Sequence, residues 1–152
     1  MIKRNKGIIL PIICGLGIGF FISNFIVCKV TVDGISMNPT YNTGDVLLVN
    51  RLDSPDRGDI VIFRRSNKVF IKRVIALQGD TVVINNSKVY VNGNMLQENY
   101  IMEKKFDGDC NLTLNEGEFF VMGDNRNNSL DSRKVGVIYE NEIIGTKLVN
   151  VR

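Results

Sequence analysis

Seven short runs rich in valine, isoleucine and phenylalanine, all after residue 44, constrain the fold of this chain most strongly. Each is bounded by Asn, Asp or Gly residues, and they cover residues 45–50, 59–63, 68–77, 81–85, 88–93, 118–123 and 142–151. Short runs of this composition are typical of β-strands, and no helical period of useful length interrupts them. The sequences NNS at 85–87 and NG at 92–93 are typical of hairpin turns. We therefore expect an all-β, mostly antiparallel domain over residues 28–152, with an exposed loop at 103–111.

Composition narrows the function classes. The chain has 152 residues, which suits one compact domain with a short appendage, and its formal net charge is only +3. No basic stripe alternates with aromatic residues, so we expect no nucleic-acid partner. There is no histidine, and Cys14, Cys28 and Cys110 have no CxxC spacing. We therefore expect no metal, no cofactor and unpaired thiols.

Residues 7–27, GIILPIICGLGIGFFISNFIV, form an uncharged apolar segment behind a basic hexapeptide. As a helix it would be roughly 31 Å long, close to the roughly 30 Å hydrocarbon core of a bilayer. A cleavable signal peptide would have a shorter apolar region ending in a small-x-small site. A soluble buried helix would tolerate the three glycines between residues 15 and 19 poorly. We expect a single transmembrane helix in the cell membrane, with residues 1–6 cytoplasmic and 28–152 outside.

Two adjacent cations lie in the predicted strand 68–77. Alternate side chains of a strand share a face, so Lys72 lies with Phe70 and Val74, while Arg73 lies on the opposite face. A lysine buried among apolar residues without a carboxylate partner loses its proton more easily. The alternative is that the Lys72 side chain reaches solvent or pairs with a carboxylate.

Ser36 lies in the segment GISMNPTYNTGD, residues 34–45, and the chain has no histidine to activate it. A neutral lysine can replace histidine as the base for a serine nucleophile. For half of the lysine to be neutral near pH 8, its pKa must fall by about 2.4 units, or roughly 3.3 kcal/mol. The pair Ser36 and Lys72 is therefore a candidate nucleophile and base.

A third polar segment, GDNRNNSLDSRKVG at 123–136, follows the predicted strand 118–123. It is an ordinary turn by composition, but it carries more charged and hydroxyl groups than a turn requires. Its carboxylates could neutralise Arg73, and one of its hydroxyls could orient the Lys72 amine.

Four segments, in this order behind an apolar N-terminus, closely resemble bacterial type I signal peptidase, the enzyme that removes signal peptides from exported proteins. They are GISMNPT (34–40), RGDIVIF (57–63), KRVIALQGD (72–80) and GDNRNNSLDSR (123–133). The resemblance covers nearly the whole chain. It implies a compact, single-span serine peptidase whose partners are signal-peptide-bearing preproteins and the lipid bilayer. Lys72, with no histidine in the chain, indicates the Ser-Lys branch of the family.

The resemblance also implies roles for individual residues. By position, Ser36 corresponds to the nucleophile, Lys72 to the general base and later general acid, and Ser129 to the hydroxyl that orients the lysine amine. The backbone N–H of Ser36 would form part of the oxyanion hole. Some members place a hydroxyl at the position of Gly34 to complete that hole, so the second donor is left open here.

Other family positions support the site or contact substrate. Those that match supporting residues form two pairs, Arg73 with Asp124 and Asp131 with Arg133. Met37 and Ile71 correspond to the pockets for small substrate side chains. Gln78 replaces the usual proline, which would stiffen the turn after the lysine strand.

Two further functions fit parts of the sequence. A self-cleaving Ser-Lys regulator would carry a DNA-binding helix pair where this chain has its apolar segment. A membrane-anchored β-domain could instead bind a partner without catalysis, and such a domain needs neither a lysine of lowered pKa nor Ser36. A specialised peptidase or an inactive paralogue would carry the same motifs.

Overall fold

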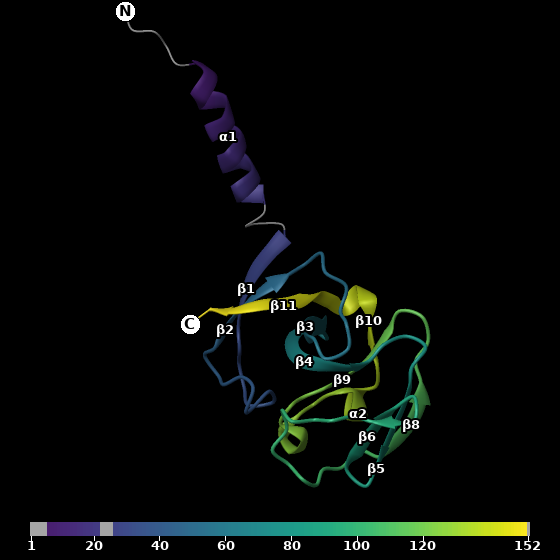
Figure 1. Ribbon diagram of the computed structural model, residues 1–152. Helices are drawn as coiled ribbons and strands as arrows, with labels where there is room; N and C mark the ends of the chain where they lie inside the picture. Colours follow the sequence, from purple (N-terminus) through teal and green to yellow (C-terminus); the bar gives the residue numbers. More distant parts are fainter. Residues whose placement is uncertain (1–5, 22–25, 152) are drawn as a thin grey trace, which may run out of the picture.

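The computed structural model describes residues 6–21 and 26–151. One long helix, α1 (Lys6–Phe21), stands apart from the β-domain (Figure 1). It has 16 residues, and no helix in the described ranges is long and apolar enough to cross a bilayer. Of the segment predicted to span the membrane, residues 22–25 lie outside the described ranges. Val27, its last residue, is the first residue of a strand instead.

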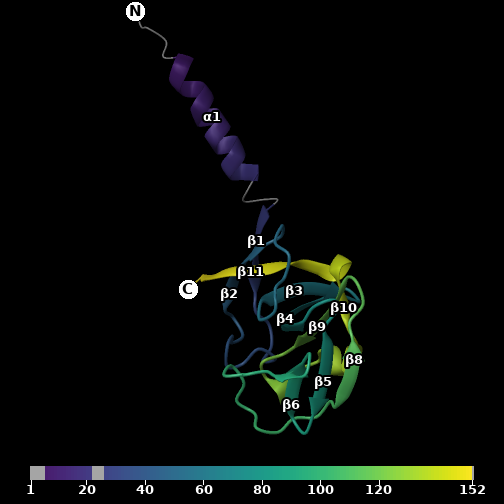
Figure 2. The ribbon, with the colours of Figure 1, turned by 45° about the vertical axis from the view of Figure 1, so that its right-hand side comes forward.

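The described β-domain consists of two antiparallel sheets. The larger sheet has seven strands in the order β1 (Val27–Thr31), β2 (Val46–Asn50), β11 (Ile143–Val151), β3 (Ile60–Arg65), β4 (Lys68–Ala76), β9 (Glu118–Met122) and β10 (Ile138–Tyr139). The smaller sheet has four strands in the order β7 (Asn94–Met95), β6 (Lys88–Val91), β5 (Thr81–Asn85) and β8 (Cys110–Thr113). Both views of the ribbon place the smaller sheet at the end of the domain away from α1 (Figure 2).

All seven predicted runs form strands, so the prediction of a mostly antiparallel β-fold is confirmed. The predicted turns are also present. Asn86 and Ser87 have φ of 50° and 60°, and Asn92 and Gly93 have φ of 52° and 79°. Positive φ at both central residues gives the twist that a two-residue hairpin needs. The remaining strands β1, β7, β8 and β10 are short and were not among the seven runs.

The prediction of an exposed loop at 103–111 was wrong in two places. Phe106 is only 6% exposed and packs in the core, where its backbone N–H and C=O both bind the Ser87 hydroxyl at 2.8 Å. Cys110 begins β8. Burial of the apolar Phe106 ring is favourable enough to hold the segment against the core although its neighbours are charged.

Three apolar clusters hold the domain together. One lies where the two sheets meet and includes Ile84, Phe120 and Met122. A second joins the turn after β1 to the large sheet through Met37, Tyr41, Leu47, Val49, Ile62 and Ile71. The third includes Phe63, Val74 and Val121. Since the second cluster contains Met37, next to the predicted nucleophile, and Ile71, next to the predicted lysine, packing fixes those two segments against each other.

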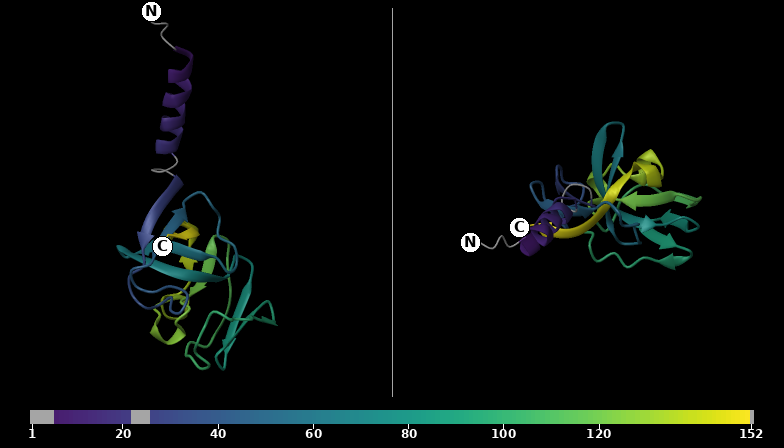
Figure 3. Two further views of the ribbon diagram at one scale, coloured as in Figure 1. Left: turned by 60° about the vertical axis from the view of Figure 1, so that its left-hand side comes forward. Right: turned by 90° about the horizontal axis from the view of Figure 1, so that it is seen from above.

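Short helices and the chain ends complete the domain. The single-turn elements are η2 (Arg126–Asn128), α2 (Ser132–Val135) and η3 (Glu140–Glu142). Strands β1 and β11 flank β2, so the two ends of the domain lie together (Figure 3). All three cysteines are free thiols.

Candidate active site

Ser36 lies in a compact turn that follows β1. The turn is closed by a hydrogen bond from the Asn38 N–H to the Ile35 carbonyl (3.1 Å). Gly34 has φ of +94°, a conformation that glycine adopts without a Cβ clash. Its backbone N–H and C=O both bind the Thr43 hydroxyl, at 3.2 and 3.0 Å. Met37, next to the serine, is buried in the core, so the turn is held at Gly34 by hydrogen bonds and at Met37 by packing.

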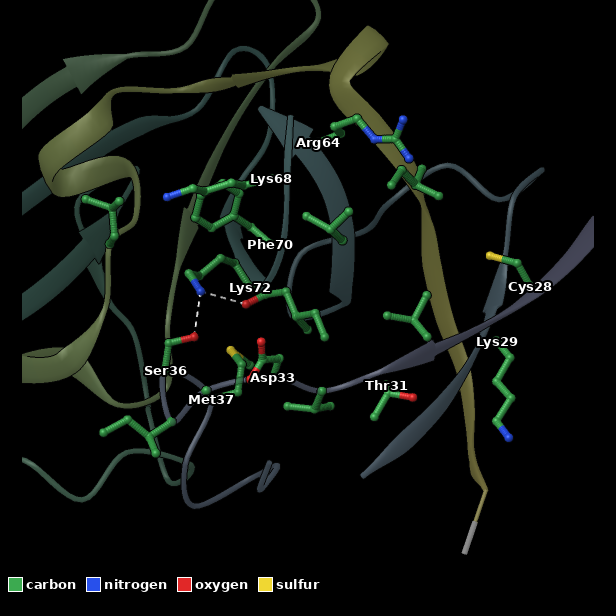
Figure 4. Close-up of a pocket in the computed structure, with 18 of the residues that line it drawn as sticks. Cys28, Lys29, Thr31, Asp33, Ser36, Met37, Arg64, Lys68, Phe70 and Lys72 are labelled. Carbon is green, nitrogen blue, oxygen red and sulfur yellow. Dashed lines mark hydrogen bonds between the residues drawn. The ribbon is translucent and has the colours of Figure 1, made fainter. Parts of the chain in front are cut away.

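Lys72 reaches Ser36 from the middle of β4. Figure 4 shows the two side chains pointing toward each other, and Lys72 Nζ donates to Ser36 Oγ at 2.7 Å. Nζ also donates to the Ile71 carbonyl at 2.8 Å. Lys72 is only 3% exposed, and its Nζ lies 5.9 Å from the centre of the Phe70 ring. The structure therefore brings the predicted nucleophile and base into contact.

The environment of Lys72 favours its neutral form. Burial lowers the pKa of Lys72 to about 8, although the carboxylates of Asp131 and Asp124 act in the opposite direction. Desolvation outweighs the two carboxylates because Arg73 and Arg133 neutralise them. A lysine with this pKa is a usable base near neutral pH.

Ser36 and Lys72 lie in a groove of about 890 Å³ between the chain around β1 and the start of β4. The predicted pocket residues Met37 and Ile71 line this groove, as does Gly34 at the position linked to the oxyanion hole. β1 is the edge strand of the large sheet, and β4 pairs with β9 only from Arg73 onward. Among the described residues, one side of the 68–72 backbone therefore has no strand partner, and it faces the same groove as β1.

A buried ion pair lies beside the groove. Arg73 Nε and Nη2 bind both carboxylate oxygens of Asp124, at 2.9 and 2.6 Å. Asp124 is fully buried and also accepts a hydrogen bond from the Thr40 hydroxyl at 2.5 Å. The Arg73 guanidinium stacks on the Tyr100 ring at 4.0 Å. Through Asp124, strand β4 is connected to Thr40, at the far end of the turn that holds Ser36 (the serine turn, residues 34–40).

The second predicted pair is also formed. Arg133 binds both oxygens of Asp131, at 2.9 and 2.8 Å, and both side chains are almost fully buried. Burial acts to raise the pKa of Asp131, but Arg133 and the Gly123 N–H outweigh it and the net shift is downward. Because Asp131 accepts the Gly123 N–H at 2.9 Å, this pair fixes the loop after β9.

Ser129 is buried close to Ser36, with Gly123 between them. A Cβ on Gly123 would lie 2.3 Å from Ser129 Oγ and 2.5 Å from the Ser36 carbonyl, so only glycine fits. Ser129 Oγ has no hydrogen-bond partner in the described part of the chain. Its orientation of the Lys72 amine remains a prediction.

Comparisons with known proteins decide the family. A family model described as signal peptidase, peptidase S26, matches residues 5–151. The chain belongs to this signal peptidase family. It is therefore a serine peptidase, as the sequence predicted.

Relatives of this peptidase cover most of its length. Signal peptidase I S of Bacillus subtilis is 36% identical over 96% of this chain and 86% of the relative. The probable signal peptidase I-1 of Synechocystis is 42% identical over 74% of this chain and 65% of the relative. A crystal structure of a signal peptidase I from Enterococcus faecalis matches with a TM-score of 0.54 and 32% identity, over 62% of this chain and 97% of that one.

Several residues that contact the peptidase's predicted site were not identified from the sequence. The Thr40 hydroxyl binds Asp124, the Thr43 hydroxyl binds Gly34, and the Asn125 side chain binds the Ile35 carbonyl. Thr40 and Asn125 lie inside the segments 34–40 and 123–133 that resemble the family, and nothing else in the sequence pointed to them. Tyr100, between the Arg73 and Arg126 guanidiniums, carried no signal because it comes from a loop outside those segments.

Gln78, which replaces the usual proline, holds the turn after β4 by a hydrogen bond. Its side-chain oxygen accepts a hydrogen bond from the Gly117 N–H at 2.9 Å, and the Gly79 N–H donates to the Leu114 carbonyl at 2.9 Å. These bonds tie the turn after β4 to the chain before β9. Within the described ranges, no group of three or more His, Cys, Asp or Glu residues is placed to hold a metal ion.

Proposed function

We propose that this peptidase is a membrane-anchored endopeptidase that removes N-terminal signal peptides from exported preproteins by means of a Ser36–Lys72 dyad. One observation carries the proposal: Ser36 Oγ and Lys72 Nζ are 2.7 Å apart in an open groove, and burial lowers the pKa of Lys72 to about 8. Family membership supports signal-peptide removal as the reaction.

In the first half-reaction, neutral Lys72 accepts the Ser36 hydroxyl proton as Oγ bonds to the carbonyl carbon before the scissile bond. The negative charge that develops on the carbonyl oxygen is stabilised by the N–H of Ser36. The C–N bond then breaks, and Lys72 returns its proton to the leaving amine. The signal peptide remains attached to Ser36 as an ester.

In the second half-reaction, neutral Lys72 removes a proton from a water molecule that attacks the ester carbonyl. The ester C–O bond breaks, and Lys72 gives the proton to Ser36 Oγ. Ser129 orients the Lys72 amine between these steps. The pairs Arg73–Asp124 and Asp131–Arg133 hold the surrounding segments without entering the chemistry.

The groove suits an extended peptide substrate. Its walls are the edge strand β1 and the open side of residues 68–72, which can pair with a substrate backbone by β-augmentation. Met37 and Ile71 then shape the two shallow pockets that select small side chains, one residue apart, before the cut.

The proposed anchor is the apolar segment 7–27, with residues 1–6 cytoplasmic and the catalytic domain 28–152 outside the cell membrane. Helix α1 covers residues 7–21 of this segment, and the basic residues Lys3, Arg4 and Lys6 precede the segment. An anchored enzyme meets its substrate's apolar segment in the same bilayer, which raises their effective concentration.

The test is cleavage of a purified preprotein by the detergent-solubilised full-length chain, with the cut site read by mass spectrometry. Ser36→Ala and Lys72→Met serve as variants, and circular dichroism checks that both are folded. We expect the wild type to cut after a small-x-small site and both variants to be inactive. Equal cleavage by Ser36→Ala would exclude the dyad, and an inert wild type would favour a binding domain or an inactive paralogue.

A further inference from the structure

Asn125 contacts the peptide units on both sides of Ser36. Its side-chain Nδ2 donates to the Ile35 carbonyl at 3.1 Å, and its backbone N–H donates to the Ser36 carbonyl at 3.0 Å. Asn125 comes from the loop after β9, 89 residues further along the chain than Ser36, so both bonds are tertiary contacts. A single residue thus restrains two successive peptide planes at the nucleophile.

The restraint on Ile35 also fixes the direction of the Ser36 N–H. The Ile35 carbonyl and the Ser36 N–H belong to one trans peptide unit and point in opposite directions. With the carbonyl held by the Asn125 side chain and by the Asn38 N–H, the Ser36 N–H points away from the loop after β9. No acceptor in the described part of the chain is assigned to this N–H. It is therefore available to a ligand.

We propose that Asn125 is a positioning residue that aligns the Ser36 N–H as an oxyanion-hole donor. The proposal rests on the proposed function, in which Ser36 is the nucleophile. Oxyanion donors are effective because they are already oriented before charge develops. Rotation of the 35–36 peptide unit would turn this donor away, and the Asn125 amide opposes that rotation.

The Asn125 amide is itself fixed. Its Oδ1 accepts hydrogen bonds from the Asn128 backbone N–H at 3.2 Å and the Asn128 side chain at 3.0 Å. With Oδ1 engaged in capping η2, Nδ2 is the atom that faces Ile35. The backbone on its N-terminal side is held by the two buried ion pairs at Asp124 and Asp131. Asn125 therefore connects the loop that these ion pairs hold to the backbone on both sides of Ser36.

Asn127 offers a matched control on the same loop. Its Nδ2 also donates to a backbone carbonyl, that of Lys105, at 3.1 Å, but in the described part of the chain it has no hydrogen bond to the serine turn. Asn125→Asp and Asn127→Asp make the same chemical change. Only the first places an oxygen instead of a donor against the Ile35 carbonyl.

The experiment compares kcat and KM of the full-length wild type, Asn125→Asp, Asn125→Ala and Asn127→Asp on one preprotein. We expect both Asn125 variants to lose about 10- to 100-fold in kcat with KM changed less than about twofold, because the interaction strengthens only in the transition state. Asn127→Asp should keep wild-type kinetics. The neutral Asn125→Ala variant should keep the wild-type pH midpoint of kcat/KM, since no hydrogen bond joins Lys72 to Asn125 in the described residues.

Other results would overturn the proposal. Wild-type kcat in both Asn125 variants would show that Asn125 does not orient the donor. A shifted pH midpoint in Asn125→Ala would show that it acts through Lys72, and a melting temperature below the assay temperature would assign it to folding alone. Full activity of Ser36→Ala, run in parallel, would instead refute the underlying dyad.

Discussion

Lys72 combines near-complete burial with two nearby carboxylates, and burial is the larger influence on its pKa, which is lowered to about 8. Only the neutral amine can accept the serine proton. We predict that kcat/KM rises with pH, with a midpoint near 8, and falls about tenfold per pH unit below it. The measurement is a pH profile of cleavage between pH 6 and 10.

The Phe70 ring supplies part of the apolar surroundings of Lys72. Phe70→Ala should admit water and move the midpoint of this profile to higher pH, because the charged lysine is then better solvated. A wild-type profile without any rise between pH 7 and 9 would contradict the assignment of Lys72 as base.

The same burial has a cost in stability. In the folded state the pKa of Lys72 is about 8, against an ordinary value of 10.5. Between pH 8 and 10.5, Lys72 therefore takes up a proton when the protein unfolds. The folded state is therefore penalised fully below about pH 8 and not at all above about pH 10.5, by about 3 kcal/mol at most. We predict that Lys72→Met is more stable than the wild type at pH 7.

This prediction is checked by urea unfolding of both proteins from pH 7 to 10. The stability difference should be constant below about pH 8 and shrink between about pH 8 and 10, because the proton that Lys72 must lose on folding is removed more easily as the pH rises toward 10.5. A difference that stays constant over the whole range would show that packing of the methionine, and not the lysine charge, is responsible.

At the scale of elements, the serine turn is held in place by the loop after β9. The Thr40 hydroxyl donates to buried Asp124, whose carboxylate also binds Arg73 of β4. We predict that Thr40→Val, which keeps the shape but removes the hydroxyl, lowers kcat by about tenfold and stability by about 1–3 kcal/mol, since a buried oxygen loses a partner. Preprotein cleavage and urea unfolding measure the two effects.

Thr40→Ser is the matched control, because it keeps the hydroxyl and removes only a methyl group. It should retain most of the activity that Thr40→Val loses. Equal losses in the two variants would indicate that the methyl group, and not the bond to Asp124, positions the turn.

The elements differ in how far the sequence predicted them. The seven runs were predictable because apolar composition and turn residues define a strand locally. The contact between Lys72 and Phe70 was also predictable, since it follows from the period of one strand. By contrast, the bond from Thr40 to Asp124 joins residues 84 apart in the sequence, and only the folded loop decides which carboxylate lies there. Phe106 was misassigned for a similar reason, because its burial depends on β5 and β6 rather than on its charged neighbours.

At the scale of the whole molecule, the helix α1 precedes β1 in the sequence, and β1 lines the groove. β1 begins at Val27 and leads directly to the serine turn, and its residues line the groove. An anchor attached to β1 would therefore hold the groove close to the bilayer surface. A preprotein whose signal peptide lies in the same bilayer would meet the groove without searching the bulk solution.

We predict that a chain starting at Ile26 cuts a membrane-inserted preprotein about 10²-fold or more slowly than the full-length chain when both are added to the same vesicles, because the effective concentration is lost. On a short soluble peptide containing the cut site, the two chains should have equal kcat/KM, since the groove is unchanged. Cleavage of both substrates is followed in one preparation of vesicles. Equal rates on the preprotein would remove the anchor from the proposed function, whereas a parallel loss on the peptide would mean that residues 1–25 support the fold of the groove itself.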